Sequence, residues 1–325
     1  MSPLVGDTPL MFLKYICHVS LVMKAPINNS AKVSVNDSSY LLNWPDLVAP
    51  LIESINTDCF AAAFFDSINR IAPLDSALIL LFRADQEPVV LFDRLHPSEE
   101  SSFYDVYLGG AYLLSPLYRR FQGLPSGFYR LGALENQNFE KSDFGTAYFN
   151  QSGLCDDANF LQKLDNDTAI IASFGRQQLQ LPFTDQELQH LHVASPVYLS
   201  ALNRQWGAGN LPELANPSAS ARSHNQLKSS LSNFGNTVLT AREQMVLQLM
   251  LAGKPSKTSA RELNISVDTE RGHRKNIYSK LKVTSQAQLF SLIFSVLGEV
   301  ANFGIGADAD ADPYASYLQT VNHES

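Results

Sequence analysis

Two stretches of helical apolar spacing frame the first half of the chain. Over residues 44–71, apolar residues recur at three- to five-residue steps, with Pro45 placed to start a helix and residues 56–58 placed to break it. A second amphipathic stretch covers residues 185–206 and contains Pro196. We therefore predict a pair of helices at the start of this region and a closing helix, kinked or split near Pro196.

Short apolar runs lie between these helices. Residues 77–82 and 89–92 are separated by a polar segment, which is the pattern of a strand, a turn and a strand. Residues 127–131 and 168–174 predict two more strands. Helices that flank several antiparallel strands predict an α+β domain over residues 44–206.

The second half changes character after Trp206. Residues 207–236 are rich in Gly, Pro, Ser, Asn and Ala and lack sustained periodicity, so we predict a linker. Helical spacing returns over residues 237–297. The final residues, 298–325, include alternating aspartates and few apolar side chains, and we predict that they are mostly disordered.

Charge separates the same two regions. The whole chain of 325 residues carries a formal net charge of -8, which excludes a wholly basic nucleic-acid coat protein. Residues 237–297 nevertheless contain nine basic and four acidic residues, a local charge of +5. A small basic helical domain joined to a larger acidic domain is typical of a DNA-binding regulator with an attached sensor.

Cysteine usage and the first residues bear on the compartment. Cys17, Cys59 and Cys155 are too few and too widely spaced for a disulfide framework or a structural zinc site, so we expect a reducing compartment and no cofactor. The apolar stretch 10–23 is short for a membrane span and lacks a basic leader. We expect a cytoplasmic protein that does not contact the membrane, with residues 1–43 as an extension whose native start is Met1 or Met23.

Capping residues define the helices of the basic region. Thr240 caps a helix that begins at Ala241, with Glu243 completing a capping box. A short helix over residues 256–263 follows, and Ser266 caps a third helix over residues 267–281. Two helices joined by a tight turn, the second with an outward basic face, have the geometry that places a helix in the major groove of DNA.

The same residues resemble a known family. The segments and residues that carry the resemblance are Leu239-Thr240-Ala241-Arg242-Glu243, Ala252-Gly253, Leu263-Asn264-Ile265-Ser266, Thr269, His273, Asn276-Ile277-Tyr278, Lys280-Leu281, Val283 and Ser285. Together they are similar to the LuxR/NarL-type helix-turn-helix, which implies an all-α four-helix domain that binds double-stranded DNA. By position, the resemblance implies that Arg271 and Lys275 reach base edges and that Thr269 and Lys257 contact phosphates. Asn276 lies on the same outward face of the third helix.

Several residues depart from the family pattern. Glu270 and Ser259 occupy positions where the family has buried apolar residues, and Met245, Pro255 and Gln286 replace its usual glutamate, serine and arginine. Burial of an unpaired carboxylate costs several kcal/mol, so either the helix shifts to expose Glu270 or a nearby arginine neutralises it. The alternative function is therefore a sensor whose degenerate helix-turn-helix binds DNA weakly and acts through protein contacts.

An apolar stripe in the fourth helix bears on assembly. Its members recur at three- and four-residue steps, on a helix that the first three helices cannot fully cover: Leu289, Leu292, Ile293, Val296 and Leu297. The family resemblance implies that residues 285–297 pair two such domains. We therefore predict a homodimer on DNA, with the helices in residues 46–71 and 185–206 as the alternative dimer surface.

The sensor also resembles part of a family. Residues 111–118, 127–130, 144–149 and 173–176 are similar to the GAF-like sensor of LuxR-type regulators, which implies a GAF/PAS-like fold and a small-molecule effector. Twelve aromatic residues gather between Phe103 and Phe149, a composition that suits a pocket for an apolar or cationic ligand as well as an ordinary core. The candidate ligand-binding residues are Tyr112, Tyr118, Phe128, Tyr129, Tyr148 and Arg176. Arg176 is the residue expected to pair with a ligand carboxylate.

Catalytic and metal motifs are missing from the sequence. It contains no GxSxG, HExxH, P-loop or GxGxxG pattern, and the histidines lack metal-ligand spacing. Cys155 is followed by two aspartates that disfavour its thiolate. We therefore predict a transcriptional regulator that senses a small metabolite, with no catalytic or metal site, and a small-molecule enzyme as the weaker alternative.

Overall fold

The computed structural model describes residues 44–134, 143–177, 181–207, 209–211, 217–303 and 311–323. Residues Leu47–Ser325 form one compact unit, separate from Met1–Asp46. The predicted N-terminal extension, residues 1–43, lies outside the described residues. No helix in the described ranges is both long enough and apolar enough to cross a bilayer.

The centre of the first region is a five-stranded antiparallel sheet. Its strand order is β2-β1-β5-β4-β3. The strands are β1 (Ser76–Arg83), β2 (Val89–Arg94), β3 (Gly127–Arg130), β4 (Leu154–Lys163) and β5 (Thr168–Gln177). Strand β4 was not among the predicted strands, because its sequence, LCDDANFLQK, interrupts the apolar positions with acids and amides. The prediction of antiparallel strands between helices is confirmed.

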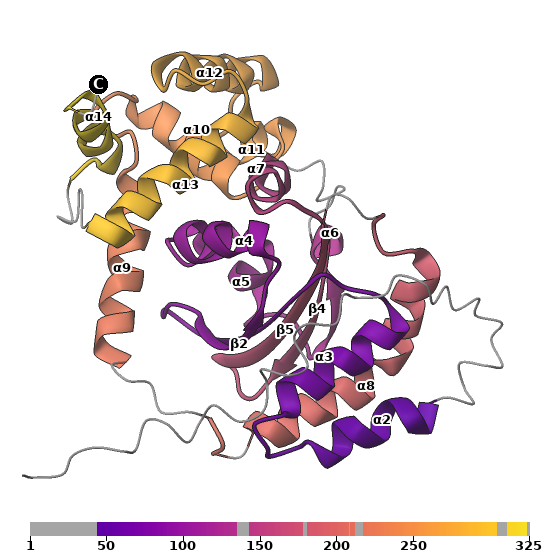
Figure 1. Cartoon of the computed structure of the whole chain (residues 1–325). Coiled ribbons are helices and arrows are strands. Elements are labelled where there is room, and N and C mark those ends of the chain that lie inside the picture. The colour runs from indigo at the N-terminus through magenta and orange to yellow at the C-terminus, as the bar shows by residue number, and fades with distance from the viewer. Residues whose placement is uncertain are drawn as a thin grey trace, which may run out of the picture. The chain divides into compact units, whose positions relative to one another are not determined.

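Helices α3 (Phe60–Ile71) and α8 (Asp185–Trp206) cover one face of the sheet (Figure 1). Three rings join these layers: Phe64 of α3 lies 6.3 Å from Phe160 of β4, and Phe160 stacks 5.2 Å from Tyr198 of α8. Helix α2 (Trp44–Glu53) precedes α3, and its Leu47 carbonyl accepts a hydrogen bond from the Ser67 hydroxyl at 3.1 Å. The predicted break at Pro196 is absent, since α8 continues through it.

Short helices cover the opposite face. They are α4 (Pro97–Ser101), the π-helix η2 (Ser102–Tyr107), the 3-10 helix η3 (Ala111–Leu114), α5 (Pro116–Arg120), α6 (Leu131–Leu134) and α7 (Asp143–Ser152). Alternate β1 residues, Leu78, Leu80 and Phe82, join the core on this side. The segment between β2 and β4 therefore builds most of this layer, and it also contains the aromatic-rich sequence.

The second region is helical. Its helices are α9 (Pro217–Asn233), α10 (Ala241–Leu251), α11 (Ser256–Glu262), α12 (Val267–Lys280), α13 (Gln286–Phe303) and α14 (Pro313–His323). Thr240 and Glu243 form the predicted capping box, and the Ser266 hydroxyl accepts a hydrogen bond from the Thr269 N–H at 3.0 Å. The first three helices of the predicted helix-turn-helix thus begin at the predicted residues.

The predicted linker contains a helix. Helix α9 was missed because its buried residues are few and lie among many serines. One of them is His224, which is 2% exposed. The Tyr112 hydroxyl lies 3.1 Å from its Nδ1, so the helix is attached to the aromatic-rich layer.

The predicted disorder of residues 298–325 is wrong for the described part of that segment. Helix α13 runs to Phe303, and α14 follows at Pro313. The Asp312 carboxylate accepts hydrogen bonds from the Gly235 N–H at 2.8 Å and the Thr237 N–H at 3.0 Å, and the Tyr314 ring lies 5.4 Å from Phe234. An aspartate of a segment predicted to be disordered therefore satisfies backbone donors, including that of Gly235, whose φ is +74°.

Candidate DNA-binding helix and ligand cavity

Helix α12 has a buried face and an exposed basic face. Ile277 and Glu270 are fully buried. The five residues predicted to contact DNA are all exposed: Arg271, Lys275, Thr269 and Asn276 on α12, and Lys257 on α11. Arg271 makes only a long ion pair with Asp268, 3.8 Å between Nη1 and Oδ1. The arrangement leaves donors of α12 and α11 available to DNA.

The unexpected acid on α12 is paired. Arg274 donates from Nε to Glu270 Oε1 at 2.6 Å. Its other nitrogens donate to the Lys254 carbonyl at 2.9 Å and to Gln286 Oε1 at 2.8 Å. Of the two alternatives for Glu270, neutralisation by an arginine is therefore the one observed. The signal in the sequence is the spacing of Glu270 and Arg274, which is the i,i+4 spacing of neighbours on a helix.

This pair connects three elements of the helical region. Lys254 lies between α10 and α11, while Gln286 begins α13. The Arg274 side chain therefore joins α12 to the turn before α11 and to the start of α13. Ser259, the other polar residue at an expected core position, is also fully buried, with its hydroxyl 3.4 Å from the Lys254 carbonyl.

A second ion pair fixes the other end of α12. Lys280 Nζ donates to Glu243 Oε2 at 2.7 Å, so the last turn of α12 is tied to the first turn of α10. Burial opposes the charge on Glu243, but hydrogen bonds from Lys280 and Thr240 outweigh it and lower its pKa. Both ends of α12 are thus positioned by charged hydrogen bonds.

The apolar stripe of α13 is covered by the chain itself. Leu289, Ile293, Val296 and Leu297 are buried, and Leu292 is partly buried. Helix α13 packs against α7, η2, α9 and α14. The prediction that this stripe is an open partner surface is wrong for this arrangement, because it counted only the first three helices of the helix-turn-helix as cover.

A cavity lies between the sheet and the short helices. Its volume is about 50 Å³. The elements around it are β1, β4, β5, α4, η2, α5, α6 and α7. Among its lining residues are the aromatic Phe103, Tyr107 and Tyr148 and the acidic Glu99 and Asp157. It is the candidate ligand site.

The two carboxyl groups have unusual protonation. Burial raises the pKa of Glu99 to about 7 and that of Asp157 to about 7. Asp157 accepts hydrogen bonds from the Ser173 hydroxyl at 2.9 Å and from the Asn159 amide, which oppose the shift. Titratable groups with strongly shifted pKa values in a cavity are candidates for a functional site.

One of the six candidate ligand residues lines this cavity, namely Tyr148. Tyr112 and Tyr118 contact His224 instead. Phe128 packs against Phe160 on the face that α8 covers, and the Tyr129 hydroxyl donates to the Pro125 carbonyl at 2.8 Å. The sequence analysis did not identify Glu99, Tyr107 or Asp157 as candidate ligand residues. Asp157 lies on β4, and that strand was not predicted.

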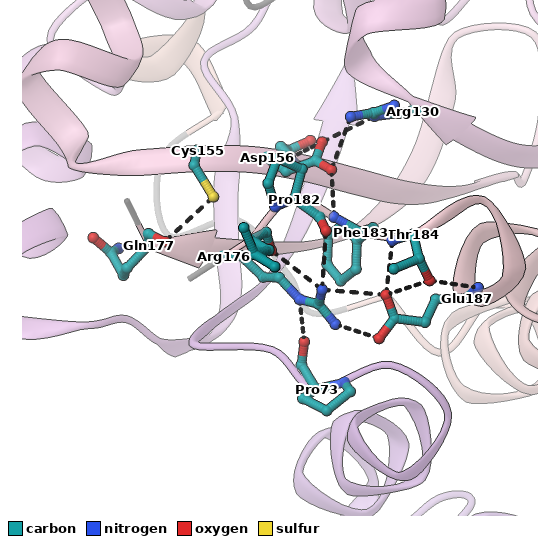
Figure 2. A network of polar contacts seen from close by, with 12 residues as sticks. Pro73, Arg130, Cys155, Asp156, Arg176, Gln177, Pro182, Phe183, Thr184 and Glu187 are labelled. Atoms are coloured by element: carbon teal, nitrogen blue, oxygen red, sulfur yellow. Dashed lines mark hydrogen bonds and ion pairs between the residues drawn. The ribbon is translucent and has the colours of Figure 1, made fainter. Parts of the chain in front are cut away.

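Arg176 lies outside the lining and is already paired (Figure 2). Its guanidinium donates to Glu187 Oε1 at 2.7 Å and to the Pro73 carbonyl at 2.7 Å. The Leu181 and Pro182 carbonyls accept further hydrogen bonds, and the Phe183 ring lies 4.3 Å from the guanidinium carbon. Figure 2 shows that the guanidinium holds the start of α8 against β5, so the carboxylate it pairs with belongs to the protein.

Within the described residues no metal site is evident, and Cys155 does not have the environment of a reactive thiol. The described part of the chain gathers no group of three or more potential metal ligands among His, Cys, Asp and Glu. Burial, followed by the charge of Asp156, raises the pKa of the Cys155 thiol. Its Sγ lies 3.3 Å from the Gln177 carbonyl, so it is held as a protonated donor.

One curated relative matches about half of the chain. This relative, the putative HTH-type transcriptional regulator in the exeN 3' region of Aeromonas salmonicida, is 26% identical over 179 residues, covering 54% of this chain and 90% of the relative.

Solved structures resemble the chain more distantly. The VqsR LBD domain of Pseudomonas aeruginosa has a TM-score of 0.43 at 20% identity, covering 50% of this chain and 95% of its own. CepR2 of Burkholderia cenocepacia has a TM-score of 0.40 at 13% identity, covering 54% and 98%. Escherichia coli SdiA has a TM-score of 0.36 at 18% identity, covering 80% and 99%.

A family model supplies the assignment. The model for bacterial regulatory proteins of the luxR family matches residues 237–293, which span α10, α11, α12 and the first part of α13. The match coincides with the capped helices and the exposed basic face of α12 described above. Residues 237–293 of this chain are therefore similar to the DNA-binding region of bacterial regulatory proteins of the luxR family.

Proposed function

We propose that this regulator reads a specific double-stranded DNA sequence with α12 and senses a small metabolite in the cavity of the sheet region. The observation that carries the proposal is the exposed basic face of α12 on a helix fixed at both ends. Arg271 and Lys275 are assigned to base edges, and Thr269 and Lys257 to phosphates. Asn276 extends the same exposed surface.

The paired Glu270 supports a working reading helix over a degenerate one. An unpaired carboxylate in the core would disorder or displace α12. Here Arg274 neutralises it and also reaches Gln286, the position where the family pattern has an arginine. These two departures from the family pattern therefore compensate one another.

The sensor assignment depends on the cavity. Its enclosed polar groups and aromatic walls are typical of a small-molecule site. We assign Glu99, Tyr107, Tyr148 and Asp157 to ligand binding, with Arg176 in a positioning role. The same proposal includes the assignment of the sheet region to a GAF-like fold.

Two copies of the chain are required for useful specificity, since one helix-turn-helix covers only a half-site. We propose a homodimer on DNA. With the α13 stripe covered, the alternative surface on the sheet region is favoured, because Ile52 of α2 and Val193 of α8 are 58% and 68% exposed.

The proposal is tested by selecting genomic fragments with the full-length protein. We expect enrichment of a small set of sites with two half-sites, and loss of that enrichment in Lys275→Ala. Arg222→Ala, which removes an exposed basic side chain from α9, outside the helix-turn-helix, is the matched control and should retain the sites. Failure to enrich any fragment would support the degenerate domain instead.

A further inference from the structure

The cavity of the sheet region has an uncompensated acidic lining. Glu99 and Asp157 both line it, while none of its described lining residues is a lysine, arginine or histidine. The charged groups that act on the two carboxyls are other acids, Asp75 on Glu99 and Asp156 on Asp157. Three other buried acids, Glu270, Glu243 and Asp156, have basic partners.

Uncompensated acids in a protein interior are costly. Taking a carboxylate out of water without a positive partner costs several kcal/mol, and such groups respond by remaining protonated. The hydrogen bonds from Ser173 and Asn159 to Asp157 stabilise its ionised form but supply no charge. A ligand that brings a positive charge would supply what the lining lacks.

The walls of the cavity suit the same kind of ligand. Phe103 and Tyr107 stack with centroids 5.6 Å apart, and Tyr148 lies 5.9 Å from Tyr107 at a tilt of 53°. Aromatic faces attract cations through the electron density of the ring and accept the apolar part of a ligand equally well. Acids and aromatic rings together therefore favour an organic cation over an anion.

Size and donor set narrow the class further. A volume of about 50 Å³ has room for a few water-sized groups, which favours a compact ligand. The described residues gather no third acid, cysteine or histidine that would complete a metal site. A primary ammonium group fits, since its three N–H donors match carboxylate and hydroxyl acceptors.

We propose that the effector of this regulator is a small primary amine, whose ammonium group binds between Glu99 and Asp157 against the rings of Tyr107 and Tyr148. This inference rests on the proposed function, in which the cavity is the effector site. It adds the charge and chemical class of the ligand.

Three probes of equal length separate charge from shape. Butylammonium, 1-butanol and butyrate are titrated into the full-length protein by calorimetry at pH 8. We expect butylammonium to bind about tenfold more tightly than 1-butanol, and butyrate not to bind, because only the ammonium group compensates the two carboxylates.

Carboxamide variants locate the interaction. Glu99→Gln and Asp157→Asn keep the size of each side chain, and each should weaken butylammonium binding about tenfold without weakening 1-butanol. Glu100→Gln is the matched control, because Glu100 is the next residue of α4 but is exposed. Thermal unfolding of each variant confirms that the fold is retained.

Each contrary result has a distinct meaning. If 1-butanol or butyrate binds as tightly as butylammonium, the cavity is an effector site but the amine assignment fails. If none of the three probes binds, or if Glu100→Gln weakens binding as much as Glu99→Gln, the amine proposal is overturned. DNA enrichment is measured without any probe, so its failure would refute the proposed regulator independently.

Discussion

The ion pair of Glu270 and Arg274 explains how a carboxylate can occupy a position where the family pattern has a buried apolar residue. The carboxylate is fully buried, and its Oε2 has no hydrogen-bond partner among the described residues. Its charge is balanced only by Arg274, whose side chain is 13% exposed. The pair is therefore sensitive to removal of either partner.

Arg274→Ala is predicted to lower the free energy of unfolding by about 3 to 5 kcal/mol, because it leaves Glu270 buried without a partner. Urea denaturation of the full-length protein measures the change. Arg271→Ala, an exposed residue of the same helix, serves as control and should change stability by less than about 0.5 kcal/mol. Glu270→Val alone should also destabilise, since it strands Arg274; a gain in stability would contradict this account.

The two cavity carboxyls predict how stability depends on pH. Their pKa values are raised by folding to about 7, so the unfolded chain releases these protons at lower pH than the folded chain does. The stability that these two groups contribute is therefore greatest below about pH 4, is lost as pH rises through about 7, and does not change further above that.

Relative to Glu99→Gln/Asp157→Asn, the wild-type protein should lose on the order of 3 kcal/mol per carboxyl between pH 4 and pH 7. Unfolding by urea at a series of pH values gives the two profiles. Parallel profiles for the wild type and the double variant would show that the carboxyls are ordinarily solvated.

At the scale of elements, the helices of the reading domain were predictable because local signals define them. Thr240, Glu243 and Ser266 cap their helices with their own side chains, and such contacts are encoded within four residues. Strand β4 was not predictable in the same way. Some of its acids and amides line the cavity, and Asp156 pairs with Arg130 at 3.0 Å. Arg130 and many of the other residues around the cavity lie far from β4 in the sequence.

The reading helix gives an element-scale prediction. Lys275→Ala and Arg271→Ala should each cost about 1 to 3 kcal/mol of binding to the selected site, with smaller losses on random DNA, because base contacts exist only at the specific sequence. Lys257→Ala, on α11, should weaken both kinds of DNA alike and reduce the salt dependence. Fluorescence anisotropy with both DNAs measures this. Equal losses on both DNAs for Lys275→Ala would reassign it to a phosphate.

At the scale of the whole molecule, the cover of α13 was beyond the sequence. The stripe of apolar residues was recognised, but part of its cover comes from α7 and η2, more than a hundred positions earlier in the chain. Periodicity identifies which face of a helix is apolar and says nothing of what covers it. The cavity was beyond the sequence for the same reason, since Glu99 and Asp157 line it together only in the folded chain.

The covered stripe predicts different outcomes for neighbouring substitutions. Ile293 is fully buried, so Ile293→Asp should lower the free energy of unfolding by about 3 kcal/mol or more. Leu292 is partly buried, and Leu292→Asp should cost less. Urea unfolding measures the stability of both variants, and sedimentation measures their oligomeric state. If instead Ile293→Asp leaves a stable monomer of a protein that is otherwise a dimer, the stripe pairs two chains.

The contact between Asp312 and the backbone at Gly235 and Thr237 bears on how such regulators can be recombined. The luxR-family match ends at residue 293, yet donors at the start of the reading domain are satisfied by a carboxylate beyond it. A chimera that joins residues 237–293 to another sensor would leave the Thr237 N–H without its carboxylate acceptor and would sever α13. A unit suitable for transfer therefore extends at least from Gly235 to α14, and the C-terminal segment must be transferred together with α10, α11 and α12.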